Sequence, residues 1–139
     1  MAEIIAFPRE NRRRHTVLVI DDEPAVRELL SDYLNQAGFN ALAVESGDEA
    51  ARMLARGIVV IDFVFSDVRM PGILNGHALA EWVFANRPDL PVLLASGDLD
   101  TVDSLEESWG ASIIAKPYDP ELVIRKIRAI LERRARRRA

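Results

Sequence analysis

The chain has 139 residues, 49% of them hydrophobic, and contains neither a cysteine nor an apolar run long enough to cross a bilayer. This composition excludes a disulfide framework and a thiolate metal site, and we expect one compact cytoplasmic domain with no membrane partner. The net charge of −4 is uneven, because residues 16–132 carry nine Lys and Arg against 20 Asp and Glu, while arginines gather at both ends. The acidic middle disfavours nucleic acid as a partner, and we predict a domain over residues 16–132 between a basic extension (1–15) and a solvated arginine-rich tail (133–139).

Short apolar runs alternate with segments of helical period, which predicts a repeated strand–helix order. Strands are expected at residues 16–20, 39–44, 62–66, 91–96 and 112–115. Helices are expected at about 24–38, 47–55, 76–86, 100–109 and from 120 onward, the last one fading after Leu131. Ser46 with Glu49 predicts a capping box, and Asp119 followed by Pro120 predicts the start of the last helix. Short connections between parallel strands favour an open α/β sandwich with helices on both faces of the sheet.

Polar residues follow the apolar runs, at the edge where the carboxyl ends of parallel strands meet. They are Asp21, Asp22, Glu23, Asp67, Ser96 and Lys116. Taken singly, each is an ordinary helix cap, turn residue or surface charge. Together the carboxylates would repel one another unless a cation lay among them, and Mg²⁺ fits because it prefers oxygen ligands. The positions of His15 and His77 give a zinc site little support.

Four motifs occur in order at the ends of the predicted strands: VIDDEP, FSDVRMPG, PVLLASGD and GASIIAKPYDP. Over residues 16–132 this set resembles the receiver domain of two-component response regulators. The resemblance implies a flavodoxin-like three-layer sandwich, in which five helices cover a five-stranded parallel sheet of order 2-1-3-4-5. It also implies the roles of the site residues: Asp67 as phosphoacceptor, Asp21, Asp22, Asp67 and the Arg69 carbonyl as Mg²⁺ ligands, Ser96 as the hydroxyl that senses the phosphoryl group, and Lys116 as its cationic partner.

The same resemblance implies a single-domain response regulator in a phosphorelay. A sensor histidine kinase or a histidine phosphotransfer protein would donate the phosphoryl group, and a downstream protein would receive the signal. The chain would catalyse its own phosphorylation and slower dephosphorylation, so whether it is called an enzyme is a matter of definition. One alternative is a small aspartate-nucleophile phosphohydrolase, although such enzymes usually carry a second acid where this chain has Arg69. Another is a phosphorylation-independent binding module.

Two departures from the common receiver pattern stand out, and other residues lead to further expectations. The loop 70–76 is one residue longer, and Ile113 stands where many receivers have an aromatic residue. Arg69 and Asp98 are placed to cover the mouth of the site. Acids between 98 and 107 and bases on the last helix suggest a partner surface, or a homodimer, through the fourth helix, fifth strand and fifth helix. The turn at Lys116 predicts a cis bond to Pro117.

Overall fold

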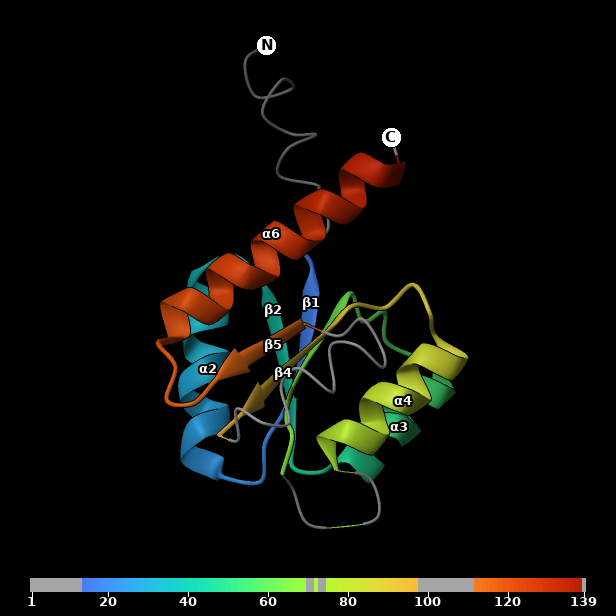
Figure 1. Cartoon of the computed structure of the whole chain (residues 1–139), viewed down its shortest axis with the longest axis horizontal. Helices are drawn as coiled ribbons and strands as arrows, with labels where there is room; N and C mark the ends of the chain where they lie inside the picture. The colour runs from blue at the N-terminus through green and yellow to red at the C-terminus, as the bar shows by residue number, and fades with distance from the viewer. Residues whose placement is uncertain (1–13, 70–71, 73–74, 98–111, 139) are drawn as a thin grey trace.

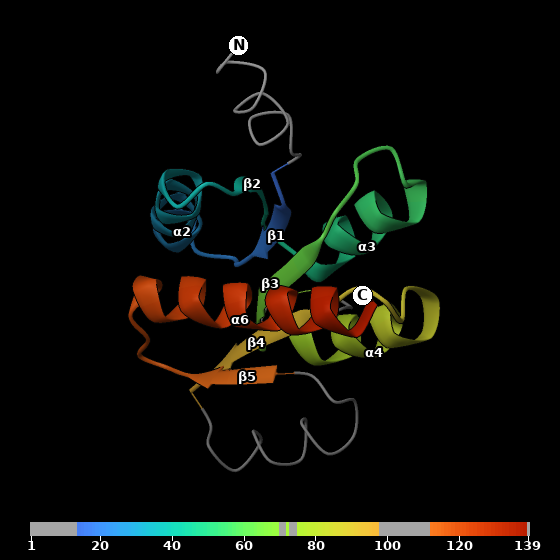
Figure 2. The same cartoon turned by 90° about the horizontal axis from the view of Figure 1, so that it is seen from above.

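Five parallel strands lie side by side in one sheet of order β2-β1-β3-β4-β5. The computed structural model describes residues 14–69, 72, 75–97 and 112–138. The elements in chain order are β1 (Thr16–Ile20), α2 (Pro24–Gln36), β2 (Asn40–Val44), α3 (Gly47–Arg56), β3 (Phe63–Asp67), α4 (Gly76–Asn86), β4 (Val92–Ser96), β5 (Ser112–Ala115) and α6 (Pro120–Arg138). Helices α2 and α6 cover one face of the sheet and α3 and α4 the other (Figures 1 and 2). The predicted sandwich and strand order are confirmed.

The central strands are buried on both faces, as a parallel sheet between two helical layers requires. In β1, Val17 and Val19 pack toward α2 and α6, whereas Leu18 and Ile20 pack toward α3 and α4. The strands pair in parallel register, with Val17 opposite both Ala41 of β2 and Phe63 of β3. Because every residue of β1 and β3 is buried, the carboxyl ends of these strands are held rigidly at one edge.

Local signals set the helix starts. The Ser46 hydroxyl accepts a hydrogen bond from the Glu49 amide at 3.2 Å, as the predicted capping box requires. The Asp119 carboxylate accepts from the Glu121 amide at 3.0 Å, next to the predicted proline at the first turn. Asn75 caps α4 in the same way, through a 2.8 Å bond from the Ala78 amide.

The predicted fading of the last helix after Leu131 is wrong, because α6 continues to Arg138. Arginine is a good helix former, and the run 133–138 contains only Arg and Ala, so nothing in the sequence breaks the helix. The helix expected at 100–109 lies outside the described residues, which form four helices. The cis bond between Lys116 and Pro117 is confirmed. None of the helices in the described part of the chain is long and apolar enough to span a membrane.

Candidate functional site

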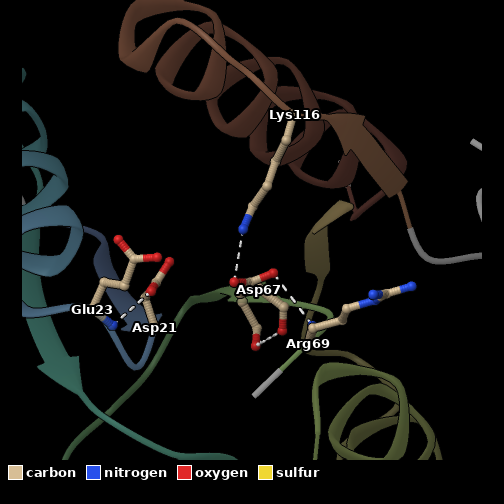
Figure 3. Close-up of polar contacts among 6 residues, drawn as sticks. Asp21, Glu23, Asp67, Arg69 and Lys116 are labelled. Atoms are coloured by element: carbon tan, nitrogen blue, oxygen red, sulfur yellow. Dashed lines mark hydrogen bonds and ion pairs between the residues drawn. The ribbon is translucent and has the colours of Figure 1, made fainter. Parts of the chain in front are cut away.

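Asp67 ends β3, and its side chain lies at the carboxyl edge of the sheet (Figure 3). The residue is only 8% exposed. Its Oδ2 accepts a hydrogen bond from Lys116 Nζ at 2.7 Å, and its Oδ1 accepts one from the Arg69 amide at 3.3 Å. A buried carboxylate with a cationic partner, at the end of a rigid strand, has the placement expected of a nucleophile.

Three carboxylates meet at this edge. Oxygens of Asp21, Asp22 and Asp67 lie within 4.8 Å of one another. Burial raises the pKa of the Asp21 carboxyl; the hydrogen bond from the Glu23 amide opposes this rise, and the negative charge of Asp67 adds to it. An all-oxygen donor set of this size fits a hard divalent cation such as Mg²⁺, which would relieve the repulsion.

The loop that carries the first two acids is fixed by main-chain contacts. Asp21 Oδ1 accepts from the Glu23 amide at 2.9 Å, which closes a tight turn before α2. Arg27, on the first turns of α2, donates from Nη1 to the Asp21 carbonyl at 2.7 Å. These contacts hold the buried carboxylate of Asp21 toward Asp67, while Asp22 stays exposed to solvent.

Ser96 ends β4, which pairs with β3, and Lys116 directly follows β5, which pairs with β4. The Lys116 amide donates to the Ser96 carbonyl at 2.8 Å, so the end of β5 is tied to the end of β4. Ser96 is buried, and the register places its neighbour Ala95 opposite Asp67. The Lys116 side chain is partly exposed to solvent, and its Nζ extends to the Asp67 carboxylate (Figure 3). The structure therefore brings Asp21, Asp22, Asp67, Ser96 and Lys116 to one edge of the sheet from four separate stretches of sequence.

Sequence reasoning did not include Tyr118 and Gly76 among the site residues. The Tyr118 ring packs edge-on against Phe65, with centroids 5.7 Å apart. Burial raises the pKa of its hydroxyl, and the nearby charges of Asp21 and Asp67 raise it further. Tyr118 could have been included from the sequence, because it lies two residues after Lys116 in the motif GASIIAKPYDP.

Gly76 begins α4 directly behind Asp67. A Cβ atom there would overlap the Asp67 carbonyl oxygen and lie 2.8 Å from Val68 Cα. The Gly76 amide also donates to the Val68 carbonyl at 2.9 Å. Only a residue without a side chain permits this close approach, and the sequence alone does not distinguish it from an ordinary helix start.

The remaining candidates lie elsewhere or outside the described residues. The Arg69 amide faces Asp67, but its exposed side chain points away from Lys116 (Figure 3). His15 precedes β1 at the opposite edge of the sheet, and His77 is partly buried in the first turn of α4. Ile113 is buried against Val68. Asp98, and with it the predicted cover over the site, lies outside the described residues.

The chain is similar to known proteins in both sequence and fold. The family model of the response regulator receiver domain matches residues 17–128. The chain is 37% identical to the response regulator protein FleR of Pseudomonas aeruginosa over 110 residues, which are 78% of this chain and 23% of that protein. It spans about half or less of the length of this and the next curated relatives.

Solved structures show the same fold. A receiver domain protein from Methanospirillum hungatei superposes with a TM-score of 0.81 at 20% identity, covering 90% of this chain and 99% of that one. A response regulator receiver protein from Sinorhizobium medicae superposes with a TM-score of 0.78 at 27% identity, covering 88% and 98%.

Proposed function

The chain belongs to the family of response regulator receiver domains, and on that premise we propose that Asp67 accepts a phosphoryl group from a phosphohistidine of a partner protein. The observation that carries the proposal is the buried Asp67 carboxylate at the end of a rigid strand, 2.7 Å from Lys116 Nζ. A sensor histidine kinase or a histidine phosphotransfer protein would be the donor.

The reaction is a transfer between two nucleophiles. An Asp67 oxygen attacks the phosphorus, the phosphorus–nitrogen bond breaks, and the histidine nitrogen leaves with the electron pair and takes up a proton. The product is an aspartyl phosphate, which water later hydrolyses back to the carboxylate and inorganic phosphate. Because the transition state is loose, catalysis consists mainly of alignment and charge neutralisation.

We propose Asp21, Asp22, Asp67 and the Arg69 carbonyl as the residues that hold Mg²⁺, which when bound neutralises charge on the phosphoryl oxygens. Lys116 supplies a second positive charge on the side of the Asp67 oxygen that it already contacts. Ser96, at the end of the neighbouring strand, would donate its hydroxyl to a phosphoryl oxygen. The donor would approach from solvent at the carboxyl ends of the strands, while the rigid β3 would keep the Asp67 carboxylate aligned with the phosphorus that it attacks.

A groove beside the site supports a proposal for how the donor binds. A groove of about 440 Å³ runs between α2 and the start of α6, and its lining includes Asp21, Leu29, Lys116 and Tyr118. Leu29 is half exposed there. We propose that the helix carrying the phosphohistidine packs on this apolar groove. Leu29→Ser would then slow transfer from a phosphohistidine protein without affecting phosphorylation by acetyl phosphate, a small donor that needs no docking surface.

Acetyl phosphate also tests the site itself. The chain should incorporate phosphate in the presence of Mg²⁺, and incorporation should be lost in Asp67→Asn or after addition of EDTA. Asp89→Asn, the same change at an exposed residue on the opposite edge, is the matched control and should behave like the parent chain. Undiminished incorporation in Asp67→Asn would refute the proposal.

The phosphorylated form is proposed to signal through contact with a downstream protein. The surface or homodimer expected from the fourth helix, β5 and the last helix remains a proposal, because the fourth helix lies outside the described residues. Arg125, on α6, is exposed and faces solvent where such a partner could bind.

A further inference from the structure

Positively charged side chains gather at the end of the sheet where the parallel strands begin, which is opposite the end that carries Asp67. In a parallel α/β fold the helices end where the strands begin, so α3, α4 and α6 all run toward the end of the sheet at which β1 starts (Figure 1). We call this end of the molecule the cationic pole. Its described arginines are Arg14, Arg52, Arg56, Arg87, Arg133, Arg134, Arg136 and Arg137.

Six of these arginines line three grooves in the described part of the chain, and two of the grooves share Arg134. Arg133, Arg134 and Arg137 of α6 line a groove with Phe84 of α4. Arg134 also lines the next groove, together with Ile61 and Arg87. Arg52 and Arg56 line a third with Ile58, whose loop joins α3 to β3.

Few acids offset this charge. Within the described residues, the acids at the pole are Glu49, Asp62, Asp89 and Glu132, and Glu49 lines the same groove as Arg52 and Arg56. Asp62 already accepts a hydrogen bond from the Thr16 amide at 2.8 Å. The pole is thus strongly positive, although residues 16–132 as a whole are acidic. A charge separation of this kind orients the molecule toward an anionic surface.

Large apolar side chains project from the same pole. Three consecutive residues of the α3–β3 loop are exposed: Ile58 by 81%, Val59 by 42% and Val60 by 59%. Phe84, near the end of α4, is 59% exposed. Nucleic acid would pair with the arginines but offers aliphatic side chains no apolar partner in its phosphate backbone. A bilayer of anionic lipid offers both, because its headgroups attract arginines and its acyl region accepts apolar side chains.

We propose that the cationic pole binds the surface of an anionic lipid bilayer, with the loop at Ile58–Val60 inserted at the level of the headgroups and the arginines of α6 against the lipid phosphates. The molecule lies on the membrane and does not cross it. In this orientation Asp67 and its carboxylate neighbours face away from the bilayer, so the negative site is not repelled by the lipid and stays open to a phosphodonor.

Sedimentation with vesicles of phosphatidylcholine containing about 30% phosphatidylserine, in about 0.1 M salt, tests the proposal. The parent chain should bind these vesicles, bind phosphatidylcholine vesicles poorly, and be released as salt rises. Arg133→Gln should weaken binding about fivefold, and the change of Arg133, Arg134, Arg136 and Arg137 together to Gln at least about 100-fold. Gln keeps the helix propensity of these positions.

Arg125→Gln is the matched control, because Arg125 is an exposed arginine of the same helix, about 12 Å farther from the pole along the helix axis. It should retain nearly all binding. The double variant Ile58→Ser and Val60→Ser should weaken binding about tenfold while keeping the salt dependence. All variants should accept phosphate from acetyl phosphate like the parent, since none changes the site.

Three results would overturn the proposal. One is no binding of the parent chain to anionic vesicles. Another is an equal loss in Arg125→Gln and Arg133→Gln, which would mean that net charge and not the pole is responsible. The third is binding to duplex DNA, measured by fluorescence anisotropy, at least as tight as binding to vesicles and unchanged in the Ile58→Ser, Val60→Ser variant, which would identify a nucleic-acid surface.

Discussion

Replacing Gly76 with Ala should displace the strand end that carries Asp67. The new Cβ would overlap the Asp67 carbonyl oxygen and lie 2.8 Å and 2.9 Å from Val68 Cα and Asp67 C, so the neighbours that must move are main-chain atoms. Overpacking of this kind costs about 1–3 kcal/mol. Loss of the Gly76–Val68 hydrogen bond adds about 0.5–1.5 kcal/mol, and the better helix propensity of Ala returns at most about 1 kcal/mol.

The net loss of about 0.5–3.5 kcal/mol corresponds to a fall of roughly 1 M in the midpoint of urea unfolding. Because the shift moves Asp67 relative to Lys116, the folded variant should also react more slowly with acetyl phosphate. Gly97→Ala is the matched control, since a Cβ there meets no atom within 4 Å among the described residues and Gly97 also follows a site residue. An unchanged midpoint and reaction rate in Gly76→Ala, or an equal loss in Gly97→Ala, would refute the reasoning.

Three further predictions concern charges. Burial raises the folded-state pKa of Asp21 above 3.8, so the ionised carboxylate destabilises the fold. Without Mg²⁺, Asp21→Asn should therefore be more stable than the parent chain at neutral pH. Urea unfolding should show this gain in stability shrinking as the pH falls through the folded-state pKa toward 3.8. Lys116→Met should slow phosphorylation of Asp67 about 100-fold, measured as a single-turnover rate with acetyl phosphate. The Arg128 guanidinium lies 5.7 Å from the centroid of the Phe39 ring, and Arg128→Gln should cost about 0.5–1 kcal/mol in urea unfolding, with Arg125→Gln as the unaffected control.

The positions of the strands and of most helices could be predicted from the sequence, because the central strands of a parallel sheet are buried on both faces and therefore read as continuous apolar runs. The site was predictable for a related reason, since residues just after parallel strands must meet at one edge. Asp21, Asp67 and Lys116 lie there because β1, β3 and β5 end there, so no knowledge of side-chain contacts was needed to group them.

Properties that depend on close approach or on distant segments were not predictable in this way. Gly76 reads as a helix start, and its contact with Asp67 appears only once α4 is packed behind β3. The prediction that the last helix fades after Leu131 is wrong, because a run of arginines is compatible with a solvated tail and with a continued helix alike. The cationic pole combines Arg52, Phe84 and Arg133, which are far apart in sequence and gather only through the parallel topology.

The central claim is that the phosphoryl group is carried by Asp67. After reaction with acetyl phosphate and Mg²⁺, borohydride reduces an aspartyl phosphate to homoserine, and peptide mass spectrometry locates that residue. The account predicts homoserine at position 67 and none at positions 21 or 22, with none at all when Mg²⁺ is removed before the reaction. Homoserine at another acid, or phosphate incorporation without homoserine at position 67, would contradict it.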